Sequence, residues 1–178
     1  MKRIVRLLAL LTVTTALSGC VTMSVSSHLQ PGVTFTTYRT WDWGTADKYP
    51  VGDARLDSNA IFKDYLEGAV EKALSTRRIM RARPGERPDI LLHYHANVSQ
   101  RFQVNEPDGN CGVDCKVNVI EYEQGTLVVD LMDATTERLL WRGWAQDSLQ
   151  GLIDNQRLLE RKVDEAVTKM FARLPSGL

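Results

Sequence analysis

An excess of charge of either sign is missing from this sequence. Its 178 residues include 22 Lys and Arg against 22 Asp and Glu, so the formal net charge is zero. A protein that binds nucleic acids in general presents a basic surface, and we therefore expect no nucleic-acid partner. With 43% hydrophobic residues the chain is too apolar for a disordered protein, and its length is that of one globular domain.

Signatures of the common enzyme classes are also missing. The sequence has no Gly-x-Ser-x-Gly elbow, no phosphate-binding P-loop and no His-Glu-x-x-His motif. It is also shorter than the ~250 residues of a typical barrel enzyme. A glycosidase needs two carboxylates across a cleft, and no cleft is evident between the candidate acids, which we interpret as surface charge: Glu121, Glu123, Asp130 and Asp133. We predict a protein that is not an enzyme and that holds no metal and no cofactor.

A long hydrophobic run occurs only near the N-terminus. Basic residues precede an apolar run over residues 7–17, which is typical of a secretory signal peptide and too short for the ~20 residues of a membrane-spanning helix. Residues 17–20, Leu-Ser-Gly-Cys, resemble the lipobox of bacterial lipoproteins. In this interpretation residues 1–19 are removed and the thiol of Cys20 carries a diacylglycerol. The alternative is an ordinary signal peptide with a chance cysteine.

The residue after Cys20 bears on localisation. It is Val21, whereas an Asp at this place favours retention in the inner membrane of Gram-negative bacteria. We therefore expect a lipid anchor in the outer membrane, on its periplasmic face. Residues 20–24 would be a short lipidated tether, and about four residues reach at most ~14 Å. The domain of residues 25–178 would sit close to the membrane surface.

Hydrophobic periodicity predicts the elements of this domain. Extended segments are expected over residues 21–29, 88–104 and 117–132 and through residues 139–144. Apolar residues at helical spacing follow Asp57 and Ser58, which are candidate N-caps of a first helix. A second such pattern follows Asp154, its candidate N-cap, and ends at Pro175. The order indicates an α+β fold: a two-layer sandwich of an antiparallel sheet with two amphipathic helices on one face.

Two details of the strands can be predicted from alternation. Ile90, Phe102 and Val104 share the apolar face of one strand, whereas His93 and His95 share its polar face. The apolar phase of residues 117–132 changes at Gly125, which predicts a β-bulge there. Aromatic residues before the first helix are expected to cover an edge of the core: Tyr38, Trp41 and Trp43.

Four segments carry a resemblance to a known family. They are residues 35–43 (FTTYRTWDW), 88–92 (PDILL), 123–134 (EQGTLVVDLMDA) and 140–143 (LWRG). Together with the lipobox they resemble the bacterial lipoprotein family called domain of unknown function 4136, over most of residues 21–174. The resemblance implies an envelope lipoprotein without an assigned activity.

The loop over residues 105–116 contains Cys111 and Cys115. In an oxidising periplasm these are an even pair once Cys20 is acylated, and we predict a disulfide between them. Free thiols, or half of a metal site, are the alternatives. A zinc site with His93 and His95 would require the loop to fold back, because Val104 lies about nine residues, or ~30 Å of extended strand, beyond His95.

A cluster of arginines follows the first predicted helix. These side chains complement the negative end of the helix dipole, and they are also a candidate patch for an anionic partner: Arg77, Arg78, Arg81, Arg83 and Arg87. The function we predict is a non-enzymatic binding or scaffolding lipoprotein, attached to the membrane through its anchor and contacting an envelope protein or polymer. An enzyme acting on envelope polymers, a metal-dependent enzyme and a homo-oligomeric structural lipoprotein are the alternatives.

Overall fold

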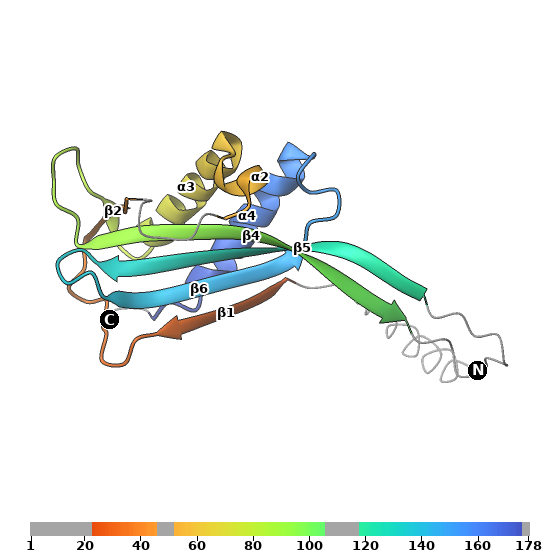
Figure 1. The fold of residues 1–178 in the computed structure, drawn as a ribbon. Coiled ribbons are helices and arrows are strands. Elements are labelled where there is room, and N and C mark those ends of the chain that lie inside the picture. Colours follow the sequence, from red (N-terminus) through yellow and green to blue (C-terminus); the bar gives the residue numbers. More distant parts are fainter. Residues whose placement is uncertain (1–22, 46–51, 106–117, 176–178) are drawn as a thin grey trace, which may run out of the picture.

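The computed structural model describes residues 23–45, 52–105 and 118–175 (Figure 1). Within these residues the chain forms one six-stranded sheet and three helices, which confirms the predicted α+β class. Helices α3 and α4 lie together on one side of the sheet (Figure 1). In this part of the chain no helix is both long and apolar enough to cross a membrane.

The sheet is mixed. Its strands follow the spatial order β1-β6-β5-β4-β2-β3 and are bounded as β1 (Ser24–Leu29), β2 (Thr40–Trp43), β3 (Met80–Arg81), β4 (Ile90–Asn105), β5 (Asn118–Asp133) and β6 (Leu139–Ser148). The first four in this order are antiparallel, but β2 pairs in parallel with both β3 and β4. The prediction of a purely antiparallel sheet is therefore wrong. A helical crossover separates β2 from β3 and β4, and such a connection joins parallel strands.

Each helix begins at a short polar side chain that accepts a backbone hydrogen bond. Asp53 caps α2 (Ala54–Asp57), Asn59 caps α3 (Ala60–Ser75) and Asn155 caps α4 (Gln156–Phe171). The predicted caps before the two long helices are wrong by one or two positions. In both cases the observed cap is an Asn that follows the predicted residue. Asn, Asp and Ser are similarly good N-caps, so residue type alone does not show which of them caps the helix.

The core is a single cluster between the helices and one face of the sheet. Trp41 and Trp141 are both fully buried in it, and Trp141 packs on Phe171 of α4 with 5.3 Å between ring centroids. The sequence predicts Trp41 at an edge of the core. This prediction is wrong, because the ring of Trp41 lies inside the core. Its ring meets that of Trp43 edge to face at 5.5 Å.

Strands β4 and β5 pair without interruption along their whole length, with Val98 opposite Gly125. The predicted bulge at Gly125 is wrong, and the irregularity lies between Leu131 and Met132, where β5 pairs with β6. A Cβ at position 125 would lie 2.6 Å from Leu149 Cδ2, so a larger residue there would require the Leu149 side chain to shift. The apolar phase changes because Ile120, beyond this point, lies on the opposite face from Leu127 and is exposed, so that it does not belong to the core.

Candidate functional site

One end of the sheet brings together the start of strand β1 and a projecting pair of strands. Ser24, Gln146, Thr126 and Asn97 are successive partners across β1, β6, β5 and β4, and so form one row. Strand β1 begins at this row and runs away from the projection (Figure 1). Strand β6 ends at Ser148, opposite Gln124. The N–H of Leu149 still donates to the carbonyl of Glu123, but beyond Ser148 β4 and β5 have no further described strand beside them. We call this two-stranded segment, residues 100–105 and 118–123, the ribbon.

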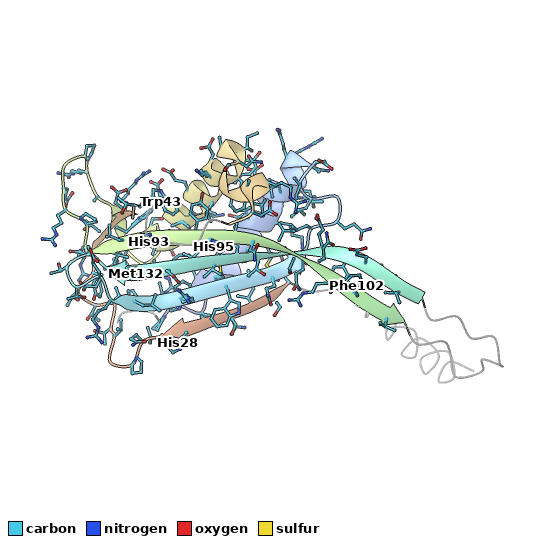
Figure 2. All side chains as sticks on the ribbon, viewed as in Figure 1. His28, Trp43, His93, His95, Phe102 and Met132 are labelled. Carbon is cyan, nitrogen blue, oxygen red and sulfur yellow. The ribbon has the colours of Figure 1, made fainter. Side chains whose placement is uncertain are left out.

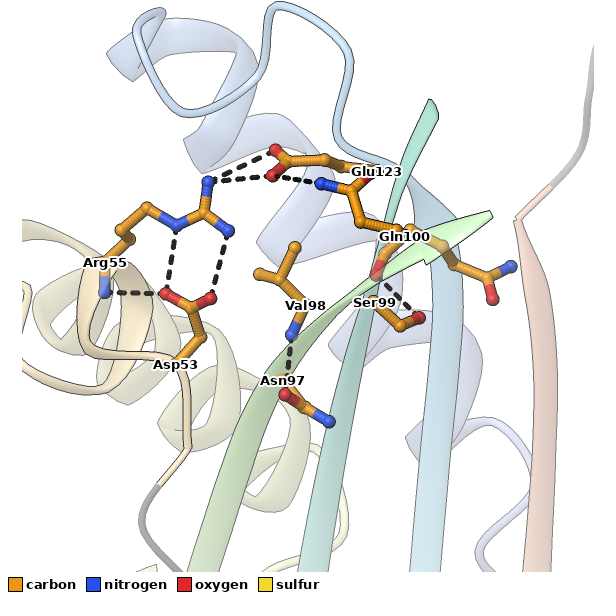
Figure 3. Close-up of polar contacts among 8 residues, drawn as sticks. Asp53, Arg55, Asn97, Val98, Ser99, Gln100 and Glu123 are labelled. Atoms are coloured by element: carbon orange, nitrogen blue, oxygen red, sulfur yellow. Dashed lines mark hydrogen bonds and ion pairs between the residues drawn. The ribbon is translucent and has the colours of Figure 1, made fainter. Parts of the chain in front are cut away.

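An ion-pair cluster joins the helical layer to the base of the ribbon (Figure 3). The Arg55 guanidinium donates from Nε and Nη2 to the two carboxylate oxygens of Asp53, both at 3.0 Å, and from Nη1 to Glu123 Oε1 at 3.0 Å. The hydrogen bonds from Arg55 hold the pKa of Asp53 below its usual range, and those to Asp53 and Glu123 raise the pKa of Arg55. The cluster ties α2 to β5 and occupies Glu123 in an internal contact.

The ribbon exposes apolar side chains. Phe102 is 65% exposed, Val104 58%, Val119 54% and Ile120 44%. Among the described residues only two other large hydrophobic side chains are exposed, Ile61 and Met80. Such clustering marks an interaction surface more often than scattered exposure does. Alternation correctly predicts that Phe102 and Val104 lie on the face that carries the core, but none of the described helices covers that face at the level of Phe102 (Figure 2).

A small apolar cavity lies under α4 at the same end of the molecule. It has a volume of about 60 Å³ and is lined by Met23, Ala96, Leu149 and Val163, among others. At its edge Lys162 Nζ donates to Asp147 Oδ2 at 2.6 Å. This hydrogen bond raises the pKa of Lys162, so the ammonium is held in its charged form. The space is too small for a drug-sized ligand, which needs roughly 300 Å³ or more.

His93 and His95 share a face of β4, as expected from alternation (Figure 2). Both are half-buried, and the ring of His93 lies so close to Gly44 that a Cβ there would be 2.0 Å from its Cε1 atom. Asp130, opposite His93, is buried and receives two hydrogen bonds of 2.6 Å from Arg142. The described residues hold no group of three or more His, Cys, Asp and Glu side chains that could bind a metal ion.

The predicted arginine patch is spread over several internal contacts. Arg77 donates to the carbonyl of Phe171 at the end of α4, and burial lowers its pKa. Arg81 pairs with Glu67 and Asp42, and its guanidinium lies 5.7 Å from the ring centre of Trp41. Arg87 reaches the carbonyl of Ala134 at 3.4 Å, while Arg78 and Arg83 are exposed. Binding of an anionic partner by these five side chains stays a prediction.

The cysteines lie outside the described residues. The predicted lipid acceptor Cys20 and the predicted disulfide pair Cys111 and Cys115 therefore stay predictions. Sequence reasoning missed Arg55, whose two acidic partners are far apart in the chain. It also missed the pairing of Asp130 with Arg142. Cross-strand charge pairs of this kind can be found from sequence only when the register is known.

Comparison with known proteins identifies a family and a fold. The family described as a domain of unknown function, DUF4136, matches residues 25–176. No curated protein matches the chain. A solved PDZ domain protein from Parabacteroides distasonis is similar with a TM-score of 0.54 at 13% identity. That match covers 86% of this chain but only 36% of the other protein. A PelC dodecamer from Paraburkholderia phytofirmans gives a TM-score of 0.47 at 12% identity, over 85% of this chain and 96% of that one.

Proposed function

The chain belongs to the DUF4136 family, and from this premise we propose that it is a non-enzymatic lipoprotein of the cell envelope. It is anchored through Cys20 in the outer membrane, on the periplasmic face, and serves as a binding or scaffolding module for an envelope protein or polymer. Family membership is compatible with this role. The observation that carries the proposal is the Leu-Ser-Gly-Cys sequence ending at Cys20, four residues before the first strand begins at Ser24.

The uses of the candidate acids support a binding role over a catalytic one. Glu123 is paired with Arg55, Asp130 with Arg142, and Asp133 accepts hydrogen bonds from its own turn. A general acid or base must be able to exchange a proton with a substrate near neutral pH. These three carboxylates instead accept hydrogen bonds from arginines or from turn amides within the fold, which favours a structural use.

Acylation of Cys20 is tested by replacing it. We expect Cys20→Ser to abolish incorporation of labelled fatty acid and to remove the protein from outer-membrane fractions, because the thiol is the acceptor of the lipid. The matched control is Cys111→Ser/Cys115→Ser, which keeps Cys20 and should be labelled like the wild type. A Cys20→Ser protein that is still labelled, or that still floats with outer-membrane vesicles, would show that the lipoprotein proposal is wrong.

Crosslinking in intact envelopes, followed by purification of the acylated protein, tests the binding role. A reproducible heterologous partner supports it. Crosslinks only between copies of the chain would instead favour the structural homo-oligomer, for which β1 offers an edge strand at one side of the sheet.

A further inference from the structure

The ribbon projects from the same end of the sheet at which strand β1 begins. In the row across the sheet, Ser24 is level with Asn97. Strand β1 runs away from this row toward Leu29, so the chain enters β1 from the ribbon end. The four residues from Ser24 back to Cys20 reach at most ~14 Å. An acylated Cys20 therefore stays at the ribbon end of the domain.

The ribbon extends beyond that reach. Along an extended strand, Phe102 lies five residues, or about 17 Å, past Asn97. Val104 and its partner Val119 lie seven residues, or about 24 Å, past the same row. If the tether is fully extended along the strand direction, these side chains are about 3 to 10 Å beyond the acylated residue. A tether that is less extended brings the bilayer closer to the row of Ser24 and Asn97, and therefore places the ribbon deeper in the bilayer.

The surface of the ribbon suits the boundary between lipid headgroups and acyl chains. Phe102 and Val104 lie on one face and Ile120 on the other, because Ile120 pairs with Gln103. The described ribbon carries three charged side chains: Arg101, which donates to Gln124, Glu121, and Glu123, which pairs with Arg55 at the base of the ribbon. Interfacial segments bury their apolar side chains roughly 5–10 Å into this boundary.

From the tether length, the strand register and the exposed side chains, we propose that the tip of the ribbon inserts into the membrane interface beside the lipid anchor. Phe102, Val104, Val119 and Ile120 are the inserting side chains, and the bilayer that holds the acyl chains of Cys20 is their partner. The proposal rests on the lipoprotein function above and deepens it. The ribbon gives the domain a second attachment and fixes its orientation, with α3 and α4 held at a defined angle to the membrane.

The test uses the full-length acylated protein in vesicles of phosphatidylethanolamine and phosphatidylglycerol, with or without brominated acyl chains that quench tryptophan. A Phe102→Trp variant reports on the ribbon, and Met80→Trp, exposed on β3 at the other side of the sheet, is the matched control. After subtraction of the wild-type emission, we expect the brominated lipid to remove about half or more of the emission from position 102 and little from position 80. Ile120→Trp gives the same readout from the other face of the ribbon.

The possible results distinguish membrane insertion, self-association and failure of acylation. If the acylated protein floats with the vesicles but the emission at 102 and 120 is quenched no more than that at 80, membrane insertion of the ribbon is refuted while the lipoprotein function stands. If the emission at 102 instead changes with protein concentration and ignores bromine, the ribbon binds a second copy and the proposal is overturned. Absence of acylation at Cys20 would refute the proposed function itself, and is read separately by intact mass.

Discussion

Close approach between single residues decides where this core tolerates change. The fully buried ring of Trp141 lies over the backbone of Gly143, two residues further along β6. A Cβ at position 143 would lie 2.2 Å from Trp141 Cη2, closer than any real contact. Because Phe171 packs on the same ring, the ring cannot move away without disturbing α4. The glycine is therefore part of the packing of the tryptophan.

We expect Gly143→Ala to lower the free energy of unfolding by ~1–3 kcal/mol, because the added methyl group overpacks a rigid site. The matched control is Gly68→Ala in α3, where a Cβ meets nothing within 4 Å. That change should stabilise the protein by up to ~1 kcal/mol, since alanine is the better helix former. Urea unfolding of both variants measures the difference. Equal stabilities for the two would mean that the ring of Trp141 can move.

The same scale shows what alternation can and cannot predict. Ile90 and Phe102 have the same parity in β4, and the sequence correctly placed both on one face of the sheet. Burial differs because α2, α3 and α4 cover only part of that face (Figure 1). Where a covering layer ends depends on helix length and docking. The pattern of one strand does not contain this information, so alternation does not distinguish the exposed Phe102 from the buried Ile90.

Between elements, a polar joint closes the sheet at the end opposite the ribbon. Tyr38 Oη donates to Asp133 Oδ2 at 3.0 Å, joining the segment before β2 to the end of β5. The other oxygen of Asp133 accepts from the backbone N–H groups of Thr136 and Thr135 in the turn before β6. These bonds hold the pKa of Asp133 below its usual range, while burial and the hydrogen bond to Asp133 raise the pKa of Tyr38 to about 12.

The joint predicts a loss of stability at both ends of the pH scale. The lowered pKa of Asp133 adds stability above the unfolded value near ~3.9, and this is lost as the pH falls below it. The raised pKa of Tyr38 adds stability below the unfolded value near ~10, and this is lost as the pH rises from about 10 toward about 12. Tyr38→Phe should flatten the alkaline loss measured by urea unfolding, with Tyr65→Phe as control. An unchanged alkaline slope in Tyr38→Phe would contradict the assignment.

Element order was predicted better than element pairing. The long strands β4 and β5 and the helices α3 and α4 have strong periodicity, and their positions follow from it. By contrast, β2 has four residues, and its parallel pairing depends on where α3 and the chain after it return. The Arg55 cluster could not be predicted for the same reason, because Arg55 reaches Glu123 of β5 only once α2 is packed against β4.

At the scale of the whole molecule the two ends of the sheet differ in character. The turn end is held by buried and hydrogen-bonded side chains, including Asp89, which accepts from the backbone of Arg39 and Thr40. The ribbon end carries exposed apolar side chains and lies next to the start of the folded chain. A lipid anchor at the second end would leave the first facing the periplasm, where a partner could reach it.

The whole chain contains three cysteines, and the proposed export and lipidation predict a state for each of them. If Cys20 carries the lipid, we expect Cys111 and Cys115 to be bridged and no thiol to react with an alkylating reagent. The strand partners Asn105 and Asn118 already close the base of that loop. A bridge within it therefore restricts the unfolded chain little, contributing at most roughly 2 kcal/mol.

Removal of this bridge should leave the fold intact. In Cys111→Ser/Cys115→Ser the uninterrupted pairing of β4 with β5 and the core under α3 and α4 remain, so we expect cooperative unfolding with a midpoint close to that of the wild type. Intact mass before and after alkylation of freshly extracted protein shows whether the two cysteines are bridged. Thermal unfolding measures how much the bridge contributes to stability. Two reactive thiols in native protein would show that no bridge forms. A double variant that fails to fold would mean that the bridge, and not the register of the strands, holds the ribbon together.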